Sequence, residues 1–514
     1  MAKLIIIGLD AGTFDLVLPW VMKDRLPNLK KLMQAGVSAK VISTIPQVSA
    51  QAWPVIYTGK NPGEIGAYNF SYYKENSYET TLINSTKIKA KCLWDYITEA
   101  GKSCAIAYIP TLYPPRKING IMVTGGMLTP DASQSTWPAD FHEEFPEGYK
   151  LFAPAYEGMD KEQFIKENLE IFEQQKQVID KLIAKNFDLV LAEFTITDIF
   201  GHIFWKEQEE EQSNALFECY RRIDEYVGKL MEKDANLIVM SDHGMGKLDE
   251  FFYVNDWLIR ERYLRLKGSK PLQAGMGRIG FTRDTALKIL TKLRLKGLLK
   301  VVPKKVKEAV PIDDRGDVGA LRVDWGNTKV FAGSFGQLYI NNVGVRPQGI
   351  VTDKEYPELI AEIKDKLKAV FKERKLELYE KKDLFKGEHA DNAPDLTIMV
   401  DDNKMITEQS TGHETLFGLN RKTGTGHHRL EGMFIASGQL FKKKIWIKDM
   451  KLADFTPTIL SALGIPLPKG LEGRVVEEAF EGKPDESGKP GKQGPEAKSE
   501  EKEKVDQAIK GLRL

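Results

Sequence analysis

One short apolar segment and the two residues that follow it constrain this sequence most. Residues 235–240 (Ala-Asn-Leu-Ile-Val-Met) are apolar without alternation, which predicts a parallel strand covered on both faces. Asp242 and His243 follow at its carboxyl end. Open α/β sheets bind their ligands at that end. A turn with a hydrogen-bonded histidine would give the same pattern, so this pair alone does not establish a site.

Two more apolar segments end in residues of the same kind. Residues 3–9 lead into Asp10, and residues 187–193 lead towards Asp198 and His202. Asp198 and His202 are four residues apart, so on a helix they face the same side and can bind one metal ion. Each motif also has an ordinary explanation. Asp10 could cap the next helix, and the Asp/His pair could lie on a surface.

Ser49 stands where a helix is predicted to begin. Residues 43–48 are expected to be extended, and a turn is expected at residues 59–63. A serine in this position is usually a helix cap. It can also be a nucleophile, because a helix N-terminus favours an anionic oxygen and a phosphoryl group. In that role Ser49 needs a metal ion or a base to lower its pKa.

A glycine-rich segment, residues 423–429, carries two adjacent histidines, His427 and His428. Glycines let a loop bend until an imidazole points at a site. We expect His428 to be the ligand, with His427 in a supporting role or none. The strand of residues 432–437 should follow.

These clusters together predict a centre with two metal ions. Three aspartates and three histidines suit a pair of borderline divalent cations about 3.5 to 4 Å apart. A serine between such cations suits phosphoryl transfer. The residues are Asp10, Ser49, Asp198, His202, Asp242, His243 and His428.

The length of 514 residues exceeds what a single core usually supports. Strands that end in ligands and alternate with helices predict an α/β fold with a doubly wound, mostly parallel sheet. We expect this core in residues 1–250 and 421–481, with an inserted cap or substrate domain at 251–420. The inserted domain is expected to bind the alcohol group of a substrate. Residues 482–514 are rich in Gly, Pro, Lys and Glu, which predicts a largely disordered tail.

Charge is informative only locally. The 74 Lys+Arg and 73 Asp+Glu leave a net charge of +1, which gives no argument for nucleic acid as a partner. A basic, leucine-rich helix is predicted near Lys292. It is either a solvated helix face or a surface for peripheral contact with an acidic membrane. The three cysteines lack metal-finger spacing, and no signal peptide or membrane span is evident, so we expect a cytoplasmic protein.

The motifs in combination identify a family resemblance. They are Gly8-Leu9-Asp10, Ser49 followed by Thr58-Gly59, Asp198-x-x-Gly201-His202, Ser241-Asp242-His243-Gly244, His428, and Asp454-Phe455-Thr456-Pro457-Thr458. This set resembles the alkaline phosphatase superfamily, and within it the type I phosphodiesterase/nucleotide pyrophosphatase group. More narrowly, it is similar to the predicted phosphohydrolase or phosphomutase proteins of archaea and bacteria. The resemblance extends to about residue 480.

The resemblance implies an alkaline-phosphatase-like fold and two metal ions, usually zinc, with manganese as the alternative. One ion would take Asp198, His202 and His428; the other would take Asp10, Asp242 and His243. Ser49 would face both and form a phosphoserine. Asn69 lies near the position of an asparagine that holds the phosphate in this family, and Lys60 is a further candidate contact. The expected substrate is a small-molecule phosphate ester.

Other functions stay open at this point. A phosphomonoesterase, a phosphomutase and a transferase of phospho-alcohol groups onto glycans or lipids fit the same ligand set. The mutase is disfavoured because the large insertion falls between His243 and His428 instead of directly after the serine. A binding protein without catalysis is a different class, which metal content would separate. The oligomeric state is not indicated.

Overall fold

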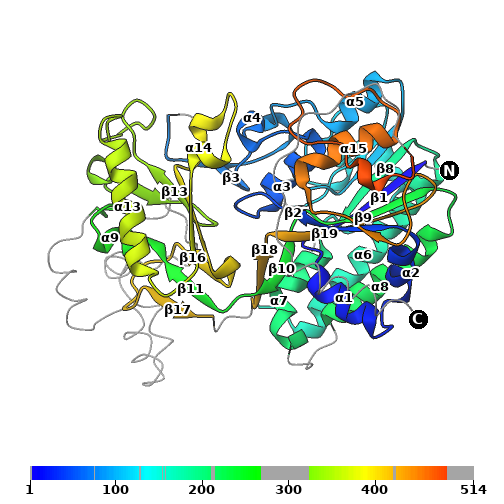
Figure 1. Ribbon diagram of the computed structural model, residues 1–514, viewed down its shortest axis with the longest axis horizontal. Helices are drawn as coiled ribbons and strands as arrows, with labels where there is room; N and C mark the ends of the chain where they lie inside the picture. Colours follow the sequence, from blue (N-terminus) through cyan, green and yellow to red (C-terminus); the bar gives the residue numbers. More distant parts are fainter. Residues whose placement is uncertain are drawn as a thin grey trace.

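The computed structural model describes residues 3–74, 76–126, 129–152, 154–156, 158–209, 215–267, 323–420 and 424–482. Figure 1 shows a large α/β body and a smaller body beside it. The predicted basic helix near Lys292 and the predicted tail after residue 482 lie outside the described residues. Among the helices that are described, none is long and apolar enough to span a membrane.

A large sheet of ten described strands forms the centre of the α/β body. Its middle is parallel and runs in the order β9 (Asn236–Met240), β1 (Leu4–Leu9), β8 (Leu189–Phe194), β5 (Cys104–Ala107) and β6 (Gly120–Val123). Outside this parallel middle lie β2 (Val37–Ile42), β7 (Thr136–Trp137), β19 (Glu431–Ser437), β20 (Ile445–Trp446) and β21 (Met450–Lys451). Only β19 and β7 run antiparallel to their neighbours in this sheet. The predicted mostly parallel α/β fold is confirmed.

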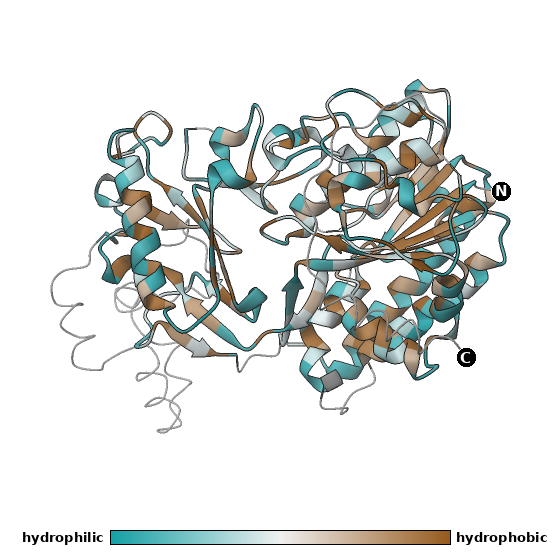
Figure 2. Ribbon diagram, viewed as in Figure 1, coloured by the Kyte–Doolittle hydropathy of each residue, from teal (hydrophilic) through white to brown (hydrophobic). Residues whose placement is uncertain are grey.

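Helices cover both faces of this sheet, as a doubly wound fold requires. Along β1, Ile5 and Ile7 pack into one apolar core, while Leu4 and Ile6 pack into the other. This is why the parallel strands are apolar without alternation, and they stand out in brown in Figure 2. The first core is covered by α1 (Phe14–Met22), α2 (Pro27–Ala35), α6 (Lys161–Ala184), α7 (Ile196–Glu209) and α8 (Ala215–Met231). The second is covered by α3 (Ser49–Thr58), α4 (Pro62–Ile65), α5 (Leu93–Glu99) and α15 (Phe455–Ala462).

The smaller body has its own sheet and its own apolar core. Its strands are β11 (Glu250–Tyr253), β12 (Val330–Ala332), β13 (Gln337–Ile340), β14 (Leu376–Glu380), β15 (Leu396–Val400), β16 (Met405–Glu408) and β17 (Phe417–Leu419). Its helices are α9 (Val254–Arg260), α13 (Tyr356–Val370) and α14 (Lys381–Leu384). These elements fall within residues 250–419, whereas the domain limits 251 and 420 stay a prediction.

One local expectation in this body is wrong. The alternation across residues 330–340 predicts a single strand, but the segment is the antiparallel hairpin of β12 and β13, with Val330 opposite Ile340. The chain reverses because Phe335 and Gly336 both adopt left-handed backbone angles, with φ of 56° and 77°. Two small antiparallel pairs complete the fold: β3 (Ser71–Tyr73) with β4 (Thr80–Leu82), and β10 (Gly244–Lys247) with β18 (Gly426–Arg429).

Gly8 on β1 connects the sheet to α3, and its substitution should disturb both. A Cβ atom at Gly8 would lie 2.4 Å from Cη2 of the buried Trp53 on α3. We expect Gly8→Ala to lower the free energy of unfolding by about 1 to 3 kcal/mol, because the ring cannot move within a packed core. Urea unfolding followed by tryptophan fluorescence measures this. Gly326→Ala is the control, since its Cβ would find no neighbour closer than 3.9 Å; equal stability of the two variants would contradict the prediction.

Candidate metal centre and nucleophile

Three adjacent parallel strands bring the predicted carboxylates together. Asp10 follows β1, Asp242 follows β9, and Asp198 lies in the first turn of α7, just after β8. Because β9, β1 and β8 are neighbours with matched registers, their carboxyl ends lie side by side. His202 lies one helical turn beyond Asp198, with its Nε2 3.3 Å from Oδ1 of Asp198.

His428 reaches the same place from a strand and not, as expected, from a loop. It lies on β18, opposite Met245 of β10. The glycine beside it serves close packing: a Cβ at Gly426 would lie 2.2 Å from the carbonyl oxygen of Gly201 on α7. This approach places the His428 ring against the His243 ring, with centroids 3.9 Å apart.

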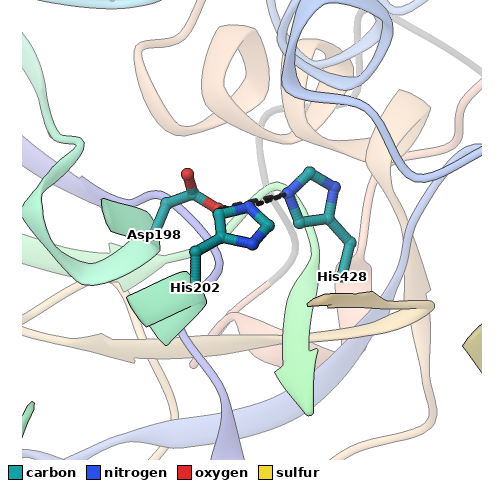
Figure 3. A group of neighbouring side chains, drawn as sticks. All are labelled: Asp198, His202 and His428. Carbon is teal, nitrogen blue, oxygen red and sulfur yellow. Dashed lines mark hydrogen bonds and ion pairs between the residues drawn. The ribbon is translucent and has the colours of Figure 1, made fainter. Parts of the chain in front are cut away.

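A first group of possible metal ligands consists of Asp198, His202 and His428 (Figure 3). Nε2 of His202 and Nε2 of His428 are 2.9 Å apart, and Nε2 of His428 is 3.2 Å from Oδ1 of Asp198. That oxygen is buried and accepts no hydrogen bond of normal geometry. Burial opposes ionisation, but His202 and His428 hold the pKa of Asp198 well below its usual range.

The other ring nitrogens show why this group fits a cation. Nδ1 of His202 is 2.9 Å from the Gly426 carbonyl, Nδ1 of His428 is 2.6 Å from the Gln47 carbonyl, and Nδ1 of His243 is 3.1 Å from the Gly244 carbonyl. A carbonyl oxygen can only accept a hydrogen bond, so each neutral ring carries its hydrogen on Nδ1 and presents a lone pair at Nε2. Two lone pairs that face each other at 2.9 Å repel unless a cation or a proton lies between them.

A second group consists of Asp10, Asp198 and His243. Nε2 of His243 is 3.5 Å from Oδ1 of Asp10 and 3.3 Å from Oδ2 of Asp242. Oδ2 of Asp242 is fully buried without a hydrogen-bond partner, while its other oxygen accepts from the N–H of Ala11. Asp198 thus belongs to both groups, while Asp242, the predicted third ligand, lies beside the second group. Its buried oxygen without a donor is costly unless a cation satisfies it, so this arrangement also fits a metal ion.

Ser49 faces the second group. Its Oγ is 3.2 Å from Oδ1 of Asp10 and 3.2 Å from Nε2 of His243. The alternative that Ser49 only caps its helix is wrong, because Val48 is the N-cap and the serine is the first helical residue. The cap suggested for Asp10 is also wrong, since Thr13 caps α1.

The electrostatics of the centre require positive charge. Burial and the carboxylates of Asp242 and Asp198 raise the pKa of Asp10 well above its usual value. Burial raises the pKa of Asp242 to about 7, although the N–H of Ala11 lowers it. Without a cation, these carboxylates cannot all be ionised at neutral pH.

Glu193 is a fourth buried carboxylate that sequence reasoning overlooked. It is fully buried on β8, where burial, opposed by the hydroxyl of Thr195, raises its pKa well above the usual value. One oxygen accepts from Thr195 and the other has no partner. A glutamate at the end of an otherwise apolar strand was the signal in the sequence.

Phe335 was also missed, and no local pattern marks it. It comes from the smaller body, and its ring lies 5.9 Å from the His428 ring at an interplanar angle of 19°. Its left-handed backbone directs a side chain of the β12–β13 turn towards the centre.

Three other predicted residues lie elsewhere around the centre. Nδ2 of Asn69 donates to Oε1 of Gln337 at 3.1 Å, and Nζ of Lys60 pairs with Glu64 at 2.5 Å. Their predicted contacts with phosphate stay predictions. His427 is buried near His202, with ring centroids 5.7 Å apart, and does not belong to either ligand group.

Metal content tests the two groups directly. We expect the purified protein, dialysed against zinc, to retain two ions per chain and His202→Ala to retain one, because the substitution removes a ligand from the first group only. Elemental analysis by mass spectrometry measures the ratio. His142→Ala is the control: this histidine lies in the 3₁₀ helix Ala139–Glu144, where its ring bonds to the Ala139 carbonyl. Equal zinc content in His202→Ala and the wild type would contradict the assignment.

Comparison with known proteins gives one family match and several similar solved structures. The family model described as type I phosphodiesterase/nucleotide pyrophosphatase matches residues 4–429. Human ectonucleotide pyrophosphatase/phosphodiesterase 5 is similar in structure, with 14% sequence identity, a TM-score of 0.50 and coverage of 93% of this chain and 100% of that one. The murine protein, in an inactive form in complex with AMP, has 14% identity, a TM-score of 0.49 and coverage of 91% and 97%. Among curated proteins, none matches by sequence. The chain belongs to the type I phosphodiesterase/nucleotide pyrophosphatase family of the alkaline phosphatase superfamily and is a hydrolase of phosphoric ester bonds.

Proposed function

We propose that this enzyme is a phosphodiesterase that depends on two divalent metal ions and works through a phosphoserine at Ser49. The observation that carries the proposal is the position of Oγ of Ser49, 3.2 Å from both Oδ1 of Asp10 and Nε2 of His243. This hydroxyl lies at the start of α3, whose positive end favours an anionic oxygen and an incoming phosphate.

The reaction has two steps, and each exchanges one bond to phosphorus. Oγ of Ser49 attacks in line and forms an O–P bond while the bond from phosphorus to one alcohol breaks, and the proton lost by Oγ ends on the departing alcohol. Water then attacks the phosphoserine, and Ser49 leaves with its hydroxyl restored. Asp10 and His243 flank Oγ, each 3.2 Å away.

The ligand groups favour zinc, with manganese as the alternative, because imidazole and carboxylate together suit these ions. Asp198, His202 and His428 would hold one ion, and Asp10, Asp242 and His243 the other. When bound, the ions supply a lower pKa for the serine hydroxyl and neutralise charge on the phosphoryl oxygens.

Charge supports a diester over a monoester. Beside Ser49 lies a cavity, and none of the described residues that line it is a lysine or an arginine. A monoester dianion carries one more negative charge than a diester, so its binding would be stabilised more by a lysine or an arginine. A phosphatase, a mutase or a transferase remains the alternative if this preference fails.

Replacing the nucleophile tests the mechanism. We expect Ser49→Ala to lower the hydrolysis of bis-p-nitrophenyl phosphate by about 10³-fold or more, since no intermediate can form. The same protein should keep both metal ions, because three other side chains hold each of them. Ser461→Ala on α15 is the control and should retain activity. Full activity of Ser49→Ala would show that the nucleophile is another group.

Substrate preference is tested with the wild type alone. With zinc or manganese present, we expect kcat/KM for bis-p-nitrophenyl phosphate to exceed kcat/KM for p-nitrophenyl phosphate. A chelator should abolish both activities, and readdition of the metal should restore them. Faster turnover of the monoester would move the assignment to a phosphatase.

A further inference from the structure

The cavity beside Ser49 is large, and its described lining residues all come from the core. Its volume is about 590 Å³, within the range of pockets that enclose a whole small molecule. Asp10, Ser49 and Asp198 form part of its wall, so a group bound there is adjacent to the reacting phosphorus. Every described residue that lines it falls between residues 10 and 199. Among the described residues, the inserted region, where the alcohol was expected to bind, contributes none to this wall.

The wall of this cavity is mostly hydrocarbon. The buried side chains of Ile171 and Phe172 on α6 line one part of it, and Ile83 and Ile196 line other parts. Phe70 and Tyr113 add aromatic rings to this surface. Burial of a matching apolar group here would stabilise a complex in proportion to its area.

The polar groups of the wall are largely engaged with the protein itself. The hydroxyl of Tyr108 accepts from that of Tyr149 at 3.1 Å. Nδ2 of Asn168 donates to the Phe164 carbonyl at 2.9 Å. Oγ1 of Thr111 bonds to the hydroxyl of Tyr57 at 2.8 Å. A ligand with many polar edges would leave those edges unpaired here, which costs binding energy.

Two exposed apolar side chains extend the wall to the surface. Leu82 on β4 and Phe152 are each 42% exposed, and both line the cavity. Large apolar groups at an otherwise polar surface mark binding regions when they join an apolar pocket. An occupant can therefore run from the reacting centre out past these two residues.

We propose that one ester group of the substrate is a long aliphatic alcohol and that this cavity binds its chain. The inference rests on the proposed phosphodiesterase function and adds the class of substrate. A single phosphodiester with an alkyl or isoprenoid chain satisfies the geometry: its one charge meets the metal centre, and its chain meets the apolar wall. Further phosphate groups would find no lysine or arginine among the described lining residues.

A series of p-nitrophenyl alkyl phosphates with methyl, butyl and octyl chains tests this. We expect kcat/KM to rise about two- to fourfold for each methylene that enters the cavity, which corresponds to about 0.8 kcal/mol or less for each buried methylene. The p-nitrophenyl ester of thymidine 5′-phosphate should be a poorer substrate than the octyl ester.

Variants at the exposed end of the cavity locate the effect. We expect Leu82→Glu and Phe152→Glu to lower the ratio of octyl to methyl kcat/KM about tenfold, because a charged group now meets the chain. Leu82→Met keeps an apolar surface and should preserve the ratio. Met22→Glu is the matched control, since Met22 on α1 is 58% exposed and does not line the cavity.

The outcomes separate this inference from the proposed function. If the methyl ester is hydrolysed in a Ser49-dependent manner but chain length has no effect, or the thymidine ester is preferred, the aliphatic substrate is excluded while the phosphodiesterase stands. If chain length matters but Leu82→Glu and Phe152→Glu keep the wild-type ratio, as the two controls do, the chain binds elsewhere and this cavity is not the site. If the metal-loaded protein hydrolyses none of the esters, the proposed function fails and the inference fails with it.

Discussion

Repulsion among buried carboxylates is the constraint on which the centre of this protein depends. Asp10 and Asp242 are almost completely buried at the ends of adjacent strands, and Asp198 lies beside them. Burial, and after it the neighbouring carboxylates, raise the pKa values of Asp10 and Asp242. An arrangement that keeps these carboxylates together is stable only if positive charge joins them. The three histidines supply nitrogen ligands for that charge and have their other nitrogens directed at backbone carbonyls.

The parallel sheet provides the rigidity that such a centre needs. Ligands placed directly after β1 and β9 and in the first turn of α7 inherit the spacing of neighbouring strands, which apolar packing on both faces holds fixed. Trp53 on α3 packs against Gly8 of β1. Because Ser49 is the first residue of the same helix, the core also positions Ser49. The nucleophile and the ligands are therefore parts of one packed unit.

The two bodies contribute differently to the site. The core supplies the five residues of the two ligand groups, with Asp242 beside them, as well as the serine and the described wall of the apolar cavity. The smaller body contacts the centre from another side, through Phe335 at His428 and through Asn403, whose Nδ2 donates to Oε1 of Gln47 at 2.7 Å. Gln47 in turn accepts from His428 through its backbone.

The sequence by itself determined the sheet and the residues that lie at its edge. Buried parallel strands must be apolar throughout, and the polar residues that follow them must lie where the chain leaves the sheet, so Asp10, Asp198 and Asp242 could be placed in advance. Only the tertiary structure decided how His428, Phe335 and the cavity reach the same centre. His428 depends on the pairing of β18 with the distant strand β10, where it lies opposite Met245, and on a close approach of Gly426 to α7. The cavity is formed by side chains from segments scattered between residues 10 and 199. Local periodicity contains no information about such distant contacts, because they arise from packing and not from the chain's own repeat.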